Sequence, residues 1–322
     1  WSSNGNKVQE KNYINGKQQG LWTLYYQETG IKKEETNYID GVQEGLWTEW
    51  YEDGQKRRER NFKDGERDST WTTWYKNGNK KFLASYSDGK LNGKYIRWYE
   101  GGIIKELDGE YLNNKKHKKW IYWNKNGQKT EEINYDNGVH HGSHIKWFGE
   151  KSDQHKKFHI NYKNGDKDGN WRHWYSSGVD SLKATYLNGE KDGHWIWWRK
   201  NGLKDKEGFY KKEKKHGLWT IWNDSTGSAY HKLHEETYVN DAIDGKVTKW
   251  YKEGGLDRQG IMRGKEKEGE WTYWERGGKR WLKFDYGDGL EKVTLGEIEE
   301  RDGITFKIGK YEPYVGIVEE TG

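Results

Sequence analysis

The sequence predicts an all-β fold, an elongated single-layer antiparallel meander or solenoid of about 12 two-stranded repeats of 24–25 residues. Three observations support this prediction. An aromatic motif recurs at a near-constant step, most repeats carry two turn signals, and the composition holds 42 Gly but one Pro. Glycine permits tight turns, whereas proline would remove hydrogen-bond donors from strand ladders.

The motif is Tyr-x-Asn-Gly-x-x-x-Gly-x-Trp-x-x-Trp-Tyr-x-Asn-Gly, followed by a charged segment that returns to Tyr. It has two aromatic positions, three residues apart. The first position holds Trp22, Trp47, Trp71, Trp120, Trp171, Trp195, Trp219 and Trp271, with Tyr95, His144 and Val247 in other repeats. The second position holds Tyr25, Trp50, Trp74, Trp98, Trp123, Trp147, Trp174, Trp198, Trp222, Trp250 and Trp274.

Each repeat is predicted to be a pair of strands joined by tight turns. Signals such as Asp40-Gly41 and Asp53-Gly54 bound segments of strand length. Asn-Gly and Asp-Gly tolerate positive φ at both central positions, so we expect type I′ hairpin turns at both signals. Each strand should then pair with its sequence neighbours, and more than about 45% of the chain should be strand, against a globular average of about 20–25%.

The two aromatic positions receive different predicted roles. The first position is expected to form a structural aromatic ladder, and the second to form a candidate binding face. Side chains alternate along a strand, so Trp47 and Tyr51 share one face, and Trp50 points to the other unless a bulge intervenes. Two alternatives follow: both faces carry rings, or the recurrent glycine introduces a bulge that re-aims one ring.

The motif weakens towards the end of the chain. We therefore expect tandem repeats over residues 1–285 and degenerate terminal repeats, a candidate cap, over residues 286–322. In this segment Ile298 and Val318 replace Trp, Asp302-Gly303 predicts a turn, and residues 311–318 hold the only Pro, which suits an edge strand. The chain opens at Trp1 without Met, so a processed or truncated product is expected.

The composition restricts the classes of molecule that the protein is expected to bind. The net charge of +5 comes from 57 basic and 52 acidic residues that are finely interspersed, which favours solubility over nucleic-acid binding. No apolar run approaches 18 residues, so no transmembrane segment is predicted. The Lys/Asn-rich, Cys-free composition favours an extracytoplasmic or cell-surface location over the cytoplasm, and it leaves no thiolate for a metal site.

Candidate chemistry was sought among histidines and paired carboxylates. Histidines gather at His140, His141 and His144, with His155 and His159 nearby. Because His144 occupies a ladder position, we interpret these residues as substituted repeat positions and not as zinc ligands. Adjacent pairs such as Glu34-Glu35 and Glu131-Glu132 face opposite sides of a strand, so they cannot form an acid/base dyad. We predict no catalytic residue, no metal, no cofactor and no enzyme activity.

At this point the repeat resembles a known family. The pattern Gly-x-Trp-x-x-Trp-Tyr-x-Asn-Gly-x-x-Lys-x-Glu-x-x-Tyr resembles the bacterial variant of the MORN repeat. It runs almost intact from Gly45 to Phe62 and more loosely from Ser69 to Tyr86, and the resemblance covers essentially residues 1–286. The resemblance implies non-catalytic hairpin arrays that serve as protein-binding scaffolds or lipid-contacting modules. It also implies a group whose members are often labelled antitoxin-like.

The resulting hypothesis is a repeat scaffold for protein–protein interaction or structural assembly at a bacterial cell surface or envelope. Two alternatives stay open. Rings spaced about 10 Å apart could stack on a glycan or other cell-surface ligand. The array could also bind a toxin in the manner of an antitoxin or immunity protein.

Overall fold

A computed structural model describes residues 1–149, 155–223, 230–287, 291–294, 298–301, 304–307 and 316–319. Strands make up 67% of the residues that the structure describes, which confirms the predicted β content. The described part of the chain contains no helix, hence none that could cross a membrane. The chain divides into two compact units, Trp1–Asp166 and Lys167–Gly322, which are described separately.

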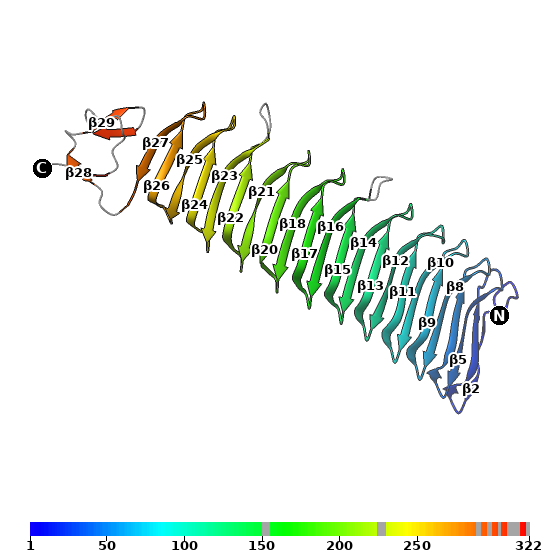
Figure 1. The fold of residues 1–322 in the computed structure, drawn as a ribbon. Helices are drawn as coiled ribbons and strands as arrows, with labels where there is room; N and C mark the ends of the chain where they lie inside the picture. Colours follow the sequence, from blue (N-terminus) through cyan, green and yellow to red (C-terminus); the bar gives the residue numbers. More distant parts are fainter. Residues whose placement is uncertain are drawn as a thin grey trace. The chain divides into compact units, whose positions relative to one another are not determined.

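The first unit is a single-layer antiparallel meander in which strands pair with their sequence neighbours (Figure 1). Its strands are β1 Gln9–Glu10, β2 Tyr13–Ile14, β3 Lys17–Gln18, β4 Gly20–Tyr25, β5 Lys32–Ile39, β6 Val42–Gln43, β7 Gly45–Trp50, β8 Lys56–Lys63, β9 Glu66–Trp74, β10 Lys80–Ser87, β11 Lys90–Trp98, β12 Lys105–Leu112, β13 Lys115–Trp123, β14 Lys129–Asp136, β15 Val139–Trp147 and β16 Lys156–Lys163. At its start β1 pairs with β4, and β2 and β3 form a short hairpin of their own.

The second unit repeats this arrangement from β17 to β27. Its strands are β17 Asp166–Trp174, β18 Asp180–Leu187, β19 Glu190–Lys191, β20 Gly193–Trp198, β21 Lys204–Lys211, β22 Lys214–Trp222, β23 Lys232–Val239, β24 Ala242–Trp250, β25 Leu256–Arg263, β26 Glu266–Trp274, β27 Arg280–Asp285, β28 Glu291–Thr294, β29 Ile298–Arg301, β30 Ile304–Lys307 and β31 Gly316–Glu319. The last four differ from the meander, because β28 and β31 pair in parallel and β29 and β30 form a separate hairpin. The predicted turn at residues 302–303 and the proline segment at residues 311–315 lie outside the described residues.

The turn after each leading Tyr has the predicted type I′ character. At Asn15-Gly16 and Asp40-Gly41, for example, φ is 52° and 73°, then 50° and 86°. The prediction was wrong for the turn after the second aromatic position. At Asp53-Gly54 only Gly54 has positive φ, at 83°. The Gly54 amide donates to the Tyr51 carbonyl at 2.9 Å, which gives a longer loop that ends in one left-handed glycine.

Two bulges per repeat set where the side chains point. One lies at the glycine two residues before the first aromatic position, where Gly93 has φ of 108° and the pairing of β10 with β11 shifts. The other lies on the charged strand: Glu49 faces Arg58 and Trp50 faces Lys56, which leaves Arg57 as an extra residue. Neither bulge falls between Trp47 and Trp50, so the two rings point to opposite faces. Both faces of the sheet therefore carry rings.

Candidate interaction face

Contacts confirm that the two aromatic positions lie on opposite faces. The indole N–H of Trp47 donates to Glu34 Oε1 at 2.7 Å. The next residue, Glu35, instead pairs with Lys32, whose Nζ lies 5.9 Å from the ring centroid of Trp50. Adjacent carboxylates therefore serve different faces, as the alternation of a strand requires. We name the side of the first position the ladder face and the side of the second position the lysine–tryptophan face.

The ladder face is packed by large rings laid over small residues. Trp120 is 2% exposed and lies against Gly109, where an added Cβ would be 2.3 Å from the indole. Gly208 stands in the same relation to Trp219, at 2.2 Å. The indole N–H of Trp120 donates to the Glu110 carbonyl at 3.1 Å, so its polar atom is satisfied although the ring is buried.

Most of the predicted ladder residues are buried. The buried members are Trp47, Trp120, Trp195, Trp219 and Trp271, and the half-buried members are Trp22, Trp71 and Trp171. Two repeats combine a larger covered residue with a smaller ladder residue. His144 lies beside Ile133 and Val247 beside Glu236, at places where other repeats combine Trp with Gly or Ala. Ring size and neighbour size are thus matched in these repeats, whereas Trp71 lies over the guanidinium of Arg60.

A row of cations covers the ladder, and the sequence analysis missed it. Lys116 Nζ lies 4.4 Å from the ring centroid of Trp120 and 5.0 Å from that of Tyr135. The same position, four residues before the first ring, holds Arg67, Lys167, Lys191, Lys215 and Lys267. The recurrence of a basic residue at this position was the available signal. These aliphatic stems cover the rings and keep the charge in water.

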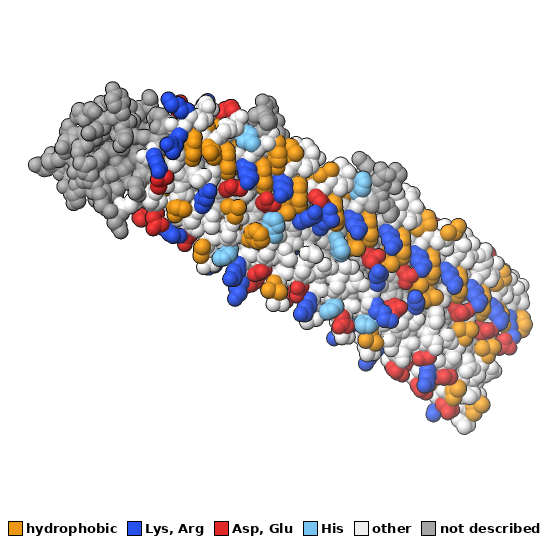
Figure 2. Space-filling view, in the orientation of Figure 1, with side chains coloured by type: hydrophobic (Ala, Val, Ile, Leu, Met, Phe, Trp, Pro, Cys, Tyr) orange, Lys and Arg blue, Asp and Glu red, His pale blue; other side chains and the backbone are white. Residues whose placement is uncertain are grey.

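The lysine–tryptophan face carries the second aromatic position, which we predicted as the binding face. The half-buried rings are Trp50, Trp74, Trp98, Trp123, Trp147, Trp174, Trp198, Trp250 and Trp274, while Trp222 is buried. Lys56 lies 5.9 Å from the ring centroid of Trp74 and pairs with Glu59. In each unit, Figure 2 shows a row in which Lys or Arg side chains alternate with hydrophobic ones.

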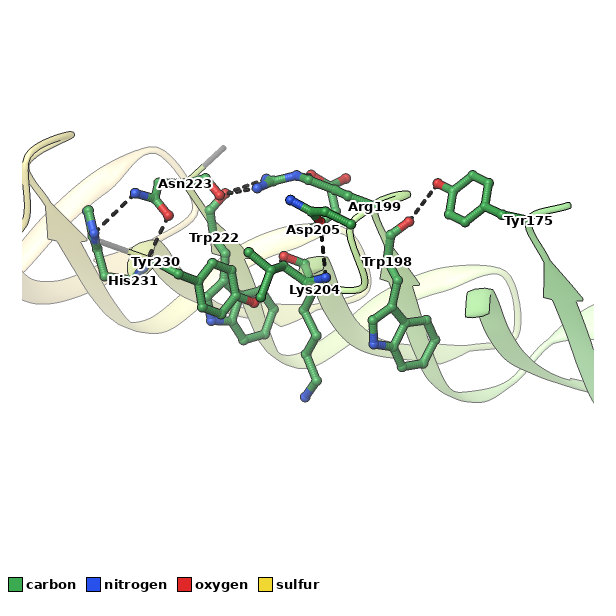
Figure 3. Close-up of polar contacts among 11 residues, drawn as sticks. Tyr175, Trp198, Arg199, Lys204, Asp205, Trp222, Asn223, Tyr230 and His231 are labelled. Carbon is green, nitrogen blue, oxygen red and sulfur yellow. Dashed lines mark hydrogen bonds and ion pairs between the residues drawn. The ribbon is translucent and has the colours of Figure 1, made fainter. Parts of the chain in front are cut away.

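Hydrogen bonds between neighbouring repeats fix the backbone under these rings. The Tyr175 hydroxyl donates to the Trp198 carbonyl at 2.8 Å (Figure 3). Tyr26, Tyr51, Tyr75, Tyr99 and Tyr251 make the equivalent bond. In the next repeat Arg199 replaces the Tyr, and its Nη2 donates to the Trp222 carbonyl at 2.9 Å. In these seven repeats the preceding repeat therefore fixes the backbone that carries the second-position ring.

Trp222 shows why one ring of this row is buried. Tyr230 lies parallel to it, with an angle of 10° between the ring planes and 6.4 Å between centroids (Figure 3). The Tyr230 hydroxyl donates to the Lys204 carbonyl at 3.0 Å, and Lys204 Nζ lies 5.3 Å from the Trp222 ring. This repeat thus offers less ring surface to a partner than the others.

The histidine cluster is absorbed by packing. His144 Nε2 lies 2.8 Å from Glu131 Oε1, and this hydrogen bond holds the pKa of Glu131 below its usual value. The His140 ring packs edge-on to Tyr135 and Tyr162. Among the described residues, no group of three or more His, Asp or Glu side chains could hold a metal ion.

Stability is expected to depend on pH through Glu236. Contact with His234 and a 2.6 Å hydrogen bond from the Tyr238 hydroxyl lower the pKa of Glu236 from 4.5 to about 2. A carboxyl with a depressed folded-state pKa stabilises the fold above pH 4.5, and this contribution disappears as the pH falls to about 2. Urea midpoints should therefore fall further with acid in the wild type than in Glu236→Gln.

Glu253→Gln, in an exposed turn of the same unit, is the matched control. It should retain the acid dependence of the wild type. Identical curves for the wild type and Glu236→Gln would contradict the assignment.

Two segments of the chain match a known family model. Residues 43–64 and 116–137 match the family model described as the MORN repeat variant. No curated protein matches the chain.

Three solved structures are similar over most of this chain at low identity. The crystal structure of TcdB2-TccC3-Cdc42 has 11% identity and a TM-score of 0.14, over 86% of this chain and 18% of that chain. The crystal structure of TcdB2-TccC3 without its hypervariable C-terminal region has 11% identity and a TM-score of 0.14, over 92% of this chain and 19% of that chain. The structure of the Photorhabdus luminescens Tc holotoxin pore with mutated TccC3 has 10% identity and a TM-score of 0.15, over 92% of this chain and 17% of that chain. The chain spans less than a fifth of the length of each of these proteins.

Proposed function

We propose, from the premise that this chain is an array of MORN-variant repeats, that it is a non-enzymatic scaffold whose lysine–tryptophan face binds a protein partner across several successive repeats. In this proposal the second-position rings supply apolar contact area and the lysines set orientation. The ladder face gives each unit its stability. We further propose a bacterial cell surface or envelope as the place of assembly.

One observation supports this proposal above the others. In six repeats the second ring is half-exposed and the carbonyl of its residue accepts a hydrogen bond from the repeat before it, so the backbone under these rings is already ordered before a partner arrives. A pre-ordered aromatic row loses little conformational entropy on binding. Because equivalent positions recur every two strands, a ligand can engage several repeats at once.

Glycan binding and toxin neutralisation are the competing functions. A polymeric glycan would favour the same contact in every repeat, whereas the lysine–tryptophan face varies: Asp180 replaces the lysine beside Trp174, and Tyr230 covers Trp222. Variation of this kind favours a protein partner. An antitoxin role would be a special case in which that partner is a toxin.

The test removes rings from one stretch of the row. The full chain and the triple variant Trp74→Ser/Trp98→Ser/Trp123→Ser would be immobilised and exposed to extract of the source cells, with mass spectrometry of what is retained. The variant should lose the proteins that the wild type captures. The matched control, Lys76→Ser/Lys125→Ser/Lys200→Ser in exposed turns, should retain them.

Deletion of one whole repeat, residues 186–209, gives a second readout. A repeat array should fold after loss of one unit, so circular dichroism should stay that of a sheet while capture weakens. Equal capture by the wild type and the triple Trp variant would refute the proposal. Release of captured material by soluble glycan would favour the glycan alternative. Turnover of a small substrate that is lost in a single Glu→Gln or His→Gln variant would establish an enzyme instead.

A further inference from the structure

The first unit has a depression of about 540 Å³, whose lining includes Thr73, Phe82 and Arg97 on the ladder side and also Trp74 and Trp98. It occurs where Thr73 stands two residues after the first ring. The same position holds Tyr122, Trp197, Ile221 and Tyr273 in other repeats. A small side chain where these other repeats carry a large one leaves space unfilled in this repeat.

Cations dominate the wall of this depression. Five lining side chains are basic, namely Arg57, Arg58, Arg60, Lys81 and Arg97, and one is acidic, Glu106. Arg57 and Arg58 share a single carboxylate, that of Glu49, at 3.0 and 3.3 Å. The wall therefore has more positive than negative charges, and an external anion can neutralise the excess.

Arg60 is one of the lining cations that form no ion pair within the described residues. Its guanidinium carbon lies 4.6 Å from the ring centroid of Trp47 and 4.7 Å from that of Trp71, so it is sandwiched between two ladder rings. Burial lowers the pKa of Arg60, and the positive charges of Arg58 and Arg67 lower it further. Among the described residues no carboxylate forms an ion pair with Arg60. A bound anion would relieve this repulsion.

The spacing of the charges indicates the shape of the ligand. Arg58 pairs with Thr73, Thr73 with Phe82 and Phe82 with Arg97, so three strand spacings, about 14 Å, separate the two arginines. One compact anion cannot reach both. In an extended peptide, carboxylates on residues i and i+4 are also about 14 Å apart. Each guanidinium keeps donors beyond its one internal contact, which for Arg97 is to Glu106 at 3.1 Å.

We propose that this depression binds an extended acidic segment of a protein, with one carboxylate on Arg58 and another on Arg97. Rings of Phe82 and Tyr95 line the space between them and suit an apolar residue at the centre of the segment. The interspersed charges of the chain as a whole lack the continuous basic stripe that a nucleic acid would need. The two arginines lie on the ladder side of the sheet, although Trp74 and Trp98 of the proposed scaffold row also line the depression.

The test measures binding of labelled peptides to the full chain by fluorescence anisotropy. The probe is a short Gly/Ser peptide with a central Leu and two Glu residues four positions apart, and its partner carries Gln at both places. We expect the Glu peptide to bind and the Gln peptide to bind at least about tenfold more weakly, with binding reduced by salt because charge pairs are screened.

Arg58→Gln/Arg97→Gln should weaken the Glu peptide by about tenfold or more. Lys249→Gln/Arg258→Gln is the matched control, since these residues occupy the same repeat positions in the second unit, where they face each other on adjacent strands. It removes the same charge and should bind as the wild type does. Urea midpoints of both variants would show that each is folded.

Several results would overturn the proposal. They are no binding of the Glu peptide, equal binding of the Glu and Gln peptides, or an equal loss in the control pair. Tighter binding of inorganic phosphate or single-stranded DNA than of the Glu peptide would assign the site to another class of anion. Failure here would leave the scaffold proposal standing, because Arg58→Gln/Arg97→Gln keeps the rings of Trp74 and Trp98, whose loss is what the scaffold test measures.

Discussion

Replacing Trp195 by alanine is expected to lower the free energy of unfolding by about 3–5 kcal/mol, the usual cost of truncating a buried aromatic side chain. Trp195 is 4% exposed. Its ring centroid lies 5.3 Å from those of Tyr186 and Tyr210, and its indole N–H donates to the Thr185 carbonyl at 3.1 Å. The substitution removes all of these contacts and leaves a cavity between two repeats.

Urea titration followed by circular dichroism measures this loss. The control is Lys200→Ala, in an exposed turn of the same unit, which should cost less than about 0.5 kcal/mol. Hydrogen exchange should show the loss of protection concentrated in β18, β20 and β21, because each repeat contacts mainly its neighbours. Equal midpoints for Trp195→Ala and Lys200→Ala would mean that the ladder is not the core.

Gly208→Ala is expected to cost about 1–3 kcal/mol, because the Trp219 indole sits closer to its strand than Ala184 would allow and must shift to the place that Trp195 takes over Ala184. The new Cβ would lie 2.2 Å from Cδ2 of Trp219, so the indole must leave its place over the strand. The backbone of Gly208 requires no positive φ, so the cost comes from the clash alone. Gly277→Ala, at a glycine with open space around it, is the control and should be nearly neutral.

The double variant Gly208→Ala/Trp219→Val tests the size match directly. It imitates the natural combination of Glu236 with Val247 and should be less destabilised than the sum of the two single changes. Additive costs in urea titration would show that the two positions do not share one space.

Much of the fold could be predicted from the sequence because the repeat states it many times. The strands follow from the spacing of the rings, and the first turn follows from Asp40-Gly41, whose two positive φ values only a type I′ turn needs. The second turn was misjudged because Asp53-Gly54 looks the same in sequence. There the chain makes a longer loop, and only Gly54 is left-handed.

The faces could not be settled from the sequence, because one extra residue in a strand reverses every side chain after it. The bulge at Arg57 is visible only in the pairing of β7 with β8. The cations over the ladder were within reach, since Lys116, Lys191 and Lys215 recur at one repeat position. The depression at Thr73 could be predicted only by aligning the repeats and by knowing on which face of the sheet Thr73 lies.

The matched sizes along the ladder have a consequence for how such a gene can grow or shrink. Excising residues 186–209 would set Trp219 over Ala184, a position that already accepts Trp195, so the junction is compatible. Excising residues 210–237 would set Val247 over Gly208 and leave a hole. Unequal recombination between repeats is therefore tolerated at some junctions and penalised at others. Each repeat is therefore fitted to the repeat that precedes it. A copy inserted at another place would need a substitution either in its ladder residue or in the residue of the new neighbour that this ladder residue covers.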